Sequence, residues 1–153
     1  MRVTSAFEFM IFFARIGTSS IDRNEGIRHK QAGNISVEII IIDQKIPKEE
    51  ALRFLGLPFE DMVKFVVDVR RGIMAFGGSM HADAEAVLLR DGSKQSDLWG
   101  GNFFPKNPAE SQIELHSLIN IRPADKNRSL VVQDEALAQS IKSVTSRLLG
   151  LPW

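Results

Sequence analysis

Short apolar runs and period-two alternation mark the strands of this chain. Four segments show these patterns, and they are residues 37–42, 62–69, 73–76 and 97–104. The first is an almost unbroken β-branched run, which is typical of a buried strand. Arg71-Gly72 separates the second segment from the third, so these two strands are expected to form a hairpin.

Residues 112–122 carry the most regular alternation in the chain. One face holds Ile113, Leu115, Ser117, Ile119 and Ile121, and the other holds Glu114, His116, Leu118, Asn120 and Arg122. Because successive side chains of a strand point to opposite sides of the sheet, this pattern predicts one long strand with its isoleucines inward and a polar row outward. A turn over residues 123–127 then leads into a returning strand at 130–132.

Three segments favour helices. Pro47 suits the first turn of a helix that Gly56 ends. Residues 81–90 fit a helical stripe, although the same letters also alternate with a period of two, and we favour the helix. The last helix is the clearest, since Asp134 is a good N-cap and apolar residues recur at helical spacing up to Gly150.

The order of these elements predicts a single α+β domain over residues 37–150. Short connections between the strands imply a mostly antiparallel sheet, and we expect the helices to pack on one face of it in a two-layer arrangement. Residues 1–36 differ in composition, with four phenylalanines among the first thirteen positions and a polar, linker-like stretch after them. We therefore expect residues 1–36 to form an N-terminal extension, either disordered or a helix docked on the domain.

Composition narrows the classes of function and partner. The chain has 153 residues with zero formal net charge, so it lacks the strong basic field that favours nucleic-acid binding. It has no cysteine, which excludes disulfides, thiolate metal sites and a cysteine nucleophile. No apolar stretch reaches the roughly 20 residues that span a bilayer. We expect a cytoplasmic protein without a membrane or nucleic-acid partner, and the sequence indicates no cofactor and no particular small-molecule ligand.

The segment from Ser79 to Glu85 concentrates side chains that could bind a metal or transfer protons. On a helix, His81 and Glu85 are one turn apart on the same side, whereas Asp83 lies on roughly the opposite side. On a strand, all three would share a face. Their spacing matches no known zinc signature, and the helix dipole alone also favours carboxylates in a first turn. His81, Asp83 and Glu85 are thus catalytic candidates, and no metal site is assigned.

A second candidate site is the outward row of the segment 112–122. Glu114 and His116 are candidates for proton transfer, and Asn120 and Arg122 are candidates for binding an anion. The alternative is structural, because antiparallel sheets commonly leave one face in water and such faces carry polar residues.

The loop that follows places two arginines around a turn. Arg122 and Arg128 could hold a carboxylate or phosphate between them, with Asn127 as a further binding candidate. A structural role for Asn127 is the alternative, because asparagine tolerates left-handed turns.

Residues 97–104 combine aromatic side chains with a glycine pair. The candidates for a protein interface are Trp99, Phe103 and Phe104, although such residues also anchor cores. The pair Gly100-Gly101 suggests a bulge or a close backbone approach, and the adjacent Asn102 is a candidate binding residue.

Several short motifs along the chain are similar to those of one family. In order, they are Val66-Val-Asp68, Arg71-Gly-Ile-Met-Ala75, His81-Ala-Asp83, Asp91-Gly-Ser-Lys-Gln95, Leu98-Trp-Gly100, Ser117-Leu-Ile-Asn-Ile-Arg-Pro123 and Asn127-Arg-Ser129. With these motifs the chain resembles a family of short bacterial and archaeal proteins catalogued as a domain of unknown function (number five-six-seven-four). Members start near the isoleucine run, so the resemblance implies that the first thirty-odd residues lie outside the shared domain. The family has no assigned activity, and the resemblance therefore implies no functional residues.

Two functional hypotheses remain open. The first is a small binding or assembly module that forms a homo-oligomer, which the neutral charge, the lack of a catalytic signature and the aromatic cluster favour. The alternative is a small metal-dependent or anion-binding hydrolase that uses the His81/Asp83/Glu85 segment or the Glu114/His116/Asn120/Arg122 row. We favour the first. The two hypotheses differ in whether ionisable side chains, above all the two histidines, share a concave space.

Overall fold

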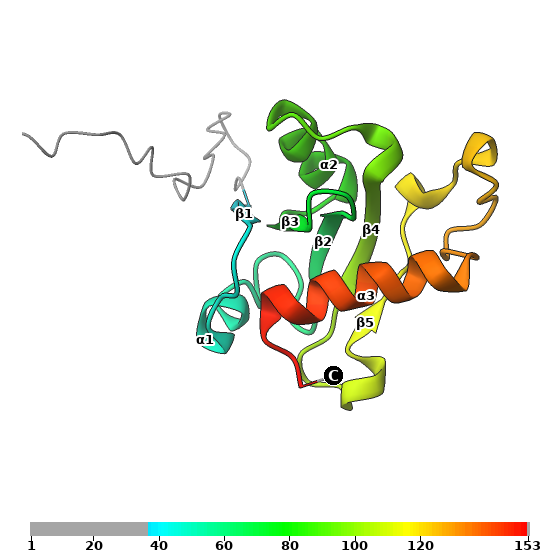
Figure 1. Ribbon diagram of the computed structural model, residues 1–153. Coiled ribbons are helices and arrows are strands. Elements are labelled where there is room, and N and C mark those ends of the chain that lie inside the picture. The colour runs from blue at the N-terminus through cyan, green and yellow to red at the C-terminus, as the bar shows by residue number, and fades with distance from the viewer. Residues whose placement is uncertain (1–36, 153) are drawn as a thin grey trace, which may run out of the picture.

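The computed structural model describes residues 37–152. They form a five-stranded sheet with three α-helices around it (Figure 1). The N-terminal extension predicted from the sequence, residues 1–36, lies outside the described residues. None of the helices in the described part combines enough length and apolar character to cross a bilayer.

Five strands make up the sheet, and they are β1 (Ile39–Ile42), β2 (Val63–Asp68), β3 (Ile73–Gly77), β4 (Leu98–Phe103) and β5 (Ile113–Glu114). Their order is β1-β3-β2-β4-β5, and every neighbouring pair is antiparallel. β2 and β3 form the expected hairpin, in which Gly72 takes a φ of 68° that suits glycine. The predicted α+β class with a mostly antiparallel sheet is confirmed.

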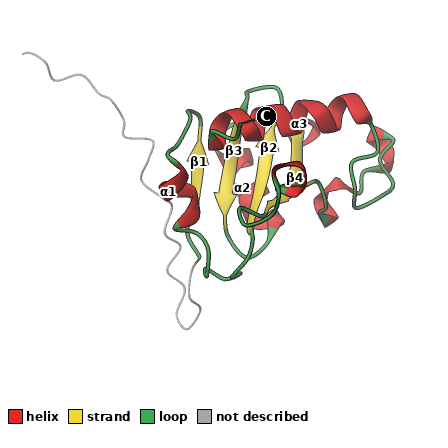
Figure 2. Cartoon of the chain, turned by 90° about the horizontal axis from the view of Figure 1, so that it is seen from below, coloured by secondary structure: helices red, strands yellow, loops and turns green. Residues whose placement is uncertain are grey.

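Helices cover both faces of the sheet. On one face, Phe65 of β2 belongs to a core shared with α1 (Lys48–Leu52) and α3 (Glu135–Leu149). On the other face, Val66 of β2 belongs to a core shared with α2 (His81–Arg90). Figure 2 shows the strands with the helices around them. One part of the prediction is thereby corrected, because the helices do not all pack on one face.

The burial of the central strands gives the reason. Every residue of β3 is buried, and so are the last four residues of β2. Apolar residues at successive positions, such as Val66 and Val67, have to be covered on both faces, which is the pattern of strands in the middle of a layered domain. The second cover comes from the three buried residues of α2, which are Ala84, Val87 and Leu88.

The helix boundaries follow the capping signals. Residues 81–90 form α2 over their whole length, which decides between helix and strand in favour of the helix. The Asp134 side chain caps α3 by accepting a hydrogen bond from the Leu137 N–H at 2.8 Å. Gly150 follows the last residue of α3 with a φ of 63°, in the left-handed region that favours glycine.

The long strand predicted over residues 112–122 is wrong for most of its length. Only Ile113–Glu114 belong to the sheet, as β5. His116 adds one isolated bridge to Val131, and the returning strand predicted at 130–132 is reduced to that bridge.

A turn at Ser117 ends the strand. The Ser117 side chain accepts a hydrogen bond from the Ile119 N–H at 3.4 Å and caps the short 3-10 helix η3 (Leu118–Asn120). The other 3-10 helices are η1 (Gln95–Asp97), η2 (Ala109–Ser111) and η4 (Pro123–Asp125). Serine and asparagine side chains that bond to nearby backbone compete with strand pairing. Beyond Ser117, alternating apolar and polar residues therefore do not point to opposite faces of a sheet.

Candidate functional site

A pocket of about 400 Å³ lies where α2 begins. Its walls come from the start of α2, from β2 and β4, and from the segment around η3. The ionisable or amide side chains in these walls are Lys64, His81, Asn102 and His116. The apolar lining residues are Met80, Ala82, Leu118, Ile119 and Leu130. The two histidines, which the sequence offers as separate candidates, thus face one common space.

Strand geometry explains the polar side of this pocket. Lys64 of β2 lies opposite Asn102 of β4, and Asn102 lies opposite Glu114 of β5. These three side chains share the face of the sheet that α2 covers, because Val66, two positions after Lys64, packs against α2. Since α2 begins only at His81, the polar row lies beside the start of the helix.

His81 is held by the backbone of β4. Its Nε2 lies 2.9 Å from the Gly101 carbonyl oxygen, and because a carbonyl can only accept, Nε2 carries a hydrogen. Burial lowers the pKa of His81 below its usual 6.5, and the charges of Lys64 and His116 lower it further, whereas the hydrogen bond to the Gly101 carbonyl and the nearby Asn102 amide partly oppose this. The ring is therefore neutral at about pH 7, and Nδ1 is left as an acceptor or a base.

Lys64 is a partly buried cation that forms no ion pair with another described residue. Burial lowers the pKa of Lys64, and the charge of Glu114 opposes this effect. The Lys64 ammonium lies 4.9 Å from the centre of the Phe59 ring, a cation–π contact. No carboxylate in the described part of the chain forms a salt bridge with it. Within the described residues, the groups that stabilise this charge are thus the Phe59 ring and, without direct pairing, the Glu114 carboxylate.

Asn102 is buried, with 5% of its surface exposed, and is incompletely bonded. Its Nδ2 donates to Glu114 Oε2 and to the backbone carbonyl of His116, each at 3.3 Å. Its Oδ1 has no hydrogen-bond partner among the described residues. An unpaired buried acceptor costs about 1–3 kcal/mol, so a donor from a ligand would relieve this cost.

The three catalytic candidates of α2 are not brought together. His81 lines the pocket, whereas the Glu85 carboxylate faces Gln95, whose Nε2 lies 3.5 Å away. Asp83 lies in the first turn of α2 but outside the pocket wall. Within residues 37–152, no three His, Asp or Glu side chains are grouped so as to hold a metal ion.

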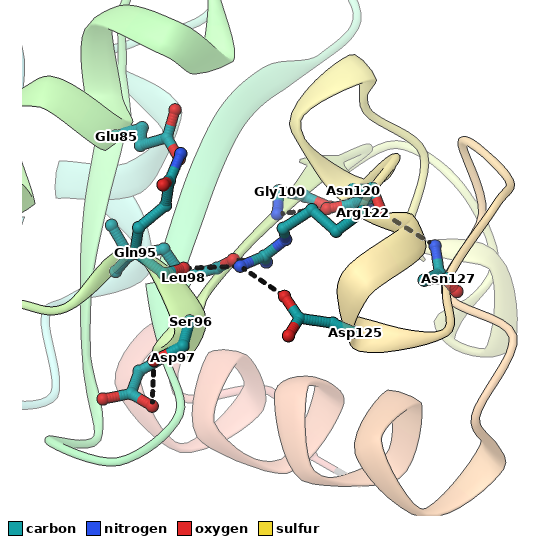
Figure 3. Close-up of polar contacts among 10 residues, drawn as sticks. All are labelled: Glu85, Gln95, Ser96, Asp97, Leu98, Gly100, Asn120, Arg122, Asp125 and Asn127. Carbon is teal, nitrogen blue, oxygen red and sulfur yellow. Dashed lines mark hydrogen bonds and ion pairs between the residues drawn. The ribbon is translucent and has the colours of Figure 1, made fainter.

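The Asn120 side chain pairs with the backbone of β4 in the way that a neighbouring strand would (Figure 3). Its fully buried amide accepts a hydrogen bond from the Gly100 N–H at 2.9 Å and donates to the Gly100 carbonyl at 3.0 Å. A second hydrogen on Nδ2 is donated to the Leu130 carbonyl, also at 3.0 Å. The amide has no free group left for a ligand.

Arg122 serves the same edge of β4, as Figure 3 shows. Its guanidinium donates to the backbone carbonyls of Gln95 and Leu98 and lies 3.9 Å from the centre of the Trp99 ring. Burial lowers the pKa of Arg122, and the Asp125 carboxylate, 3.8 Å away, is the main opposing charge. The guanidinium therefore links the segment after η3 to the backbone of η1 and β4.

The predicted outward row is consequently split into two parts. Glu114 and His116 remain beside the pocket, where Glu114 bonds Asn102 and His116 lines the wall. Asn120 and Arg122 instead direct their side chains to the backbone of β4, and their predicted role as binding residues stays a prediction.

The anion clamp predicted between Arg122 and Arg128 is not formed. The Arg122 guanidinium is bound to β4, and Arg128 is exposed with its backbone N–H donating to the Gln133 side chain. Asn127 is buried, with 4% of its surface exposed, and its Nδ2 donates to the Asn120 carbonyl at 2.9 Å. The structural alternative holds for Asn127, which ties the loop to η3.

Trp99 and Phe103 belong to the core and not to a surface. Each is 4% exposed, and both lie in the core that α1 and α3 cover. Alternation along β4 turns both rings toward this buried face, which fits the alternative that such residues anchor a core. Phe104, the third candidate, is partly buried just beyond β4.

Sequence reasoning does not offer Lys64 as a site residue, and it does not show that the loop before α2 faces the same space as His116. The available signal for Lys64 is the alternation of β2, which places it on the side of the sheet opposite to Phe65. For the loop, the signal is a glycine pair directly before a helix, Gly77-Gly78, followed by Ser79 in the pocket wall.

Replacing His81 by glutamine is expected to flatten the dependence of stability on pH. The folded protein lowers the pKa of His81 below 6.5, so the unfolded chain takes up this proton first as the pH falls. Stability is therefore fully present above 6.5 and is lost as the pH falls from there through the folded pKa. The melting temperature, measured between about pH 7.5 and pH 5, should fall less in H81Q than in the wild type. Equal slopes for the two proteins would contradict the assignment.

Comparison with known proteins identifies a family. A family model described as a protein of unknown function (DUF5674) matches residues 40–148. No curated protein and no solved structure gives a significant match. The matched range contains every residue of the pocket wall and confirms the resemblance found in the sequence motifs. The chain therefore belongs to the DUF5674 family.

Proposed function

We propose that this protein is a binding module for a small molecule, with its site in the pocket at the start of α2. The observation that carries the proposal is the pocket itself, where Lys64, His81 and His116 meet the buried and incompletely bonded Asn102. Concave sites with mainly apolar walls and a few convergent polar groups are the usual sites of small ligands.

The polar residue Asn102 of the pocket is buried, whereas two of the large apolar side chains of the pocket are exposed. Asn102 is 5% exposed, whereas Met80 and Leu118 in the same wall are 56% and 77% exposed. Covering these two large apolar side chains would remove apolar surface from water, which is favourable at about 25 cal/mol per Å². A ligand with an apolar body and a polar end fits this arrangement.

The experiment that tests the proposal blocks the pocket. Ala82 is exposed, lines the pocket and lies in the first turn of α2, so Ala82→Trp is expected to fill the space. Fragments that bind the wild type in ligand-observed NMR should lose about tenfold or more in affinity. Ala136→Trp is the matched control, because it puts the same side chain at an exposed position in the first turn of α3. A wild type that binds no fragment, or binding that A82W leaves unchanged, would contradict the proposal.

An acid–base enzyme is the second candidate function, favoured by the common pocket of the two histidines. The neutral ring of His81 could accept a proton, and the Lys64 ammonium could stabilise developing negative charge. Turnover of simple esters or phosphate esters that is lost in His81→Gln, with binding retained, would establish this function. Binding without turnover in both proteins would exclude it for those substrates.

Self-association also remains part of the proposal. The exposed apolar side chains around the outer part of η3 and the segment after it are Leu118, Ile121 and Val131. A second copy of the chain could cover them, although contact at Leu118 would also close the pocket. Light scattering at micromolar concentration measures the mass in solution, and a strict monomer would remove this part of the proposal.

A further inference from the structure

The first turn of α2 is open toward the pocket. Met80, its N-cap residue, has an extended backbone, and no side chain caps this end of the helix. The backbone N–H groups of His81 and Ala82 have no acceptor among the described residues, and both residues line the pocket. Free N–H groups at the positive end of a ten-residue helix favour an anion.

Two side chains of the same pocket independently point to a bound ligand group. Asn102 is 5% exposed, and its Oδ1 has no partner. Lys64 lines the pocket as a partly buried ammonium without a salt bridge in the described part of the chain. A partly desolvated cation gains more from a counter-ion than an exposed one does. The helix end, the amide and the ammonium therefore converge on one space.

The acidic groups nearby form no direct pair with Lys64. Glu114 is held by the Asn102 Nδ2 at 3.3 Å and does not pair with Lys64. Asp83 lies in the first turn of α2, but it is not part of the pocket wall. Glu114 thus acts on Lys64 only through its charge and without direct pairing, and no carboxylate of the described residues forms a salt bridge with the ammonium.

We infer that the polar end of the pocket binds an oxyanion of an organic ligand, a carboxylate or a phosphate, between the first turn of α2 and the Lys64 ammonium. This inference rests on the proposed binding function and specifies the chemistry of the ligand's polar end. A hydroxyl or N–H group of the same ligand would satisfy Asn102 Oδ1. The exposed rim of Met80 and Leu118 would cover the apolar body.

The test compares charged and neutral probes of similar shape. Hydrocinnamate and phenyl phosphate carry the two kinds of oxyanion, and hydrocinnamyl alcohol is the neutral counterpart of the first. Titrations followed by protein NMR should show at least one anion binding about tenfold or more tightly than the alcohol. The amide signals of His81 and Ala82 should move with the anion and much less with the alcohol. The tighter of the two anions distinguishes a carboxylate site from a phosphate site.

Lys64→Met should remove the preference for the anion while the alcohol binds as before. Lys106→Met is the matched control, because Lys106 is exposed and lies outside the pocket wall. The amide signals of the wild type keep the test decisive even where K64M folds poorly. Equal affinity for charged and neutral probes would overturn the inference and leave the proposed binding function standing. A pocket that binds no probe and no fragment would overturn both.

Discussion

Replacement of Asn120 by alanine is expected to lower the free energy of unfolding by about 3–5 kcal/mol. The Asn120 amide bonds both the N–H and the C=O of Gly100, which are buried hydrogen bonds, and also the Leu130 carbonyl, which is partly buried. Alanine leaves these backbone groups without a partner, and each such group costs about 1–3 kcal/mol. Urea denaturation followed by circular dichroism measures the change.

Two further variants sharpen this measurement. Asn107→Ala removes an exposed asparagine whose Nδ2 bonds one carbonyl at 3.3 Å, and it should change the free energy of unfolding by less than about 0.5 kcal/mol. Asn120→Asp keeps the shape but turns an acceptor toward the Gly100 and Leu130 carbonyls, so it should destabilise at least as much as alanine. An N120A protein as stable as N107A would show that Asn120 does not pair the edge of β4.

Much of the fold could be predicted because its signals are local. The β2–β3 hairpin follows from alternation around Arg71-Gly72, and α3 follows from its apolar stripe and from the Asp134 cap. Each of these signals involves residues close together in the sequence. Their interpretation needs no knowledge of which distant segment packs against them.

The structure of the segment after β5 could not be predicted, because its alternating apolar and polar residues do not form a strand. Beyond Ser117 the chain pairs with β4 through side chains and not through its backbone. The partner of Asn120 is Gly100, twenty residues earlier in the sequence. A Cβ at Gly100 would lie 2.7 Å from the Ser117 side chain, so the close approach depends on that glycine. From the sequence, the glycine pair indicates that another segment lies close to the backbone of β4, but it does not indicate which segment.

The candidate site was predictable only in pieces. His81 and His116 stand out in the sequence as single residues, but their common pocket depends on the turn at Ser117 and on where α2 begins. Lys64 and Asn102 join them through the pairing of β2 with β4, which a single strand pattern does not reveal. The site therefore depends on how the strands pair in the sheet. Separate sequence segments show the single residues but not that they lie together.

Replacement of Arg122 by methionine is expected to lower the free energy of unfolding by about 3 kcal/mol. Methionine fills similar space but leaves the Gln95 and Leu98 carbonyls without the donors that now bind them. It also removes the cation above the Trp99 ring, 3.9 Å from the ring centre. Chemical denaturation of both proteins measures the loss.

Arg128→Met is the matched control, since the sequence alone treats Arg122 and Arg128 as equal members of one clamp. Arg128 is exposed, so this variant should change the free energy of unfolding by less than about 0.5 kcal/mol. Arg122→Lys should lie between Arg122→Met and the wild type, because lysine keeps the charge but cannot reach two carbonyls with a planar fork. Equal losses in R122M and R128M would show that the edge of β4 does not depend on Arg122. An R122M protein that folds normally but no longer binds anions would support the anion site predicted between Arg122 and Arg128.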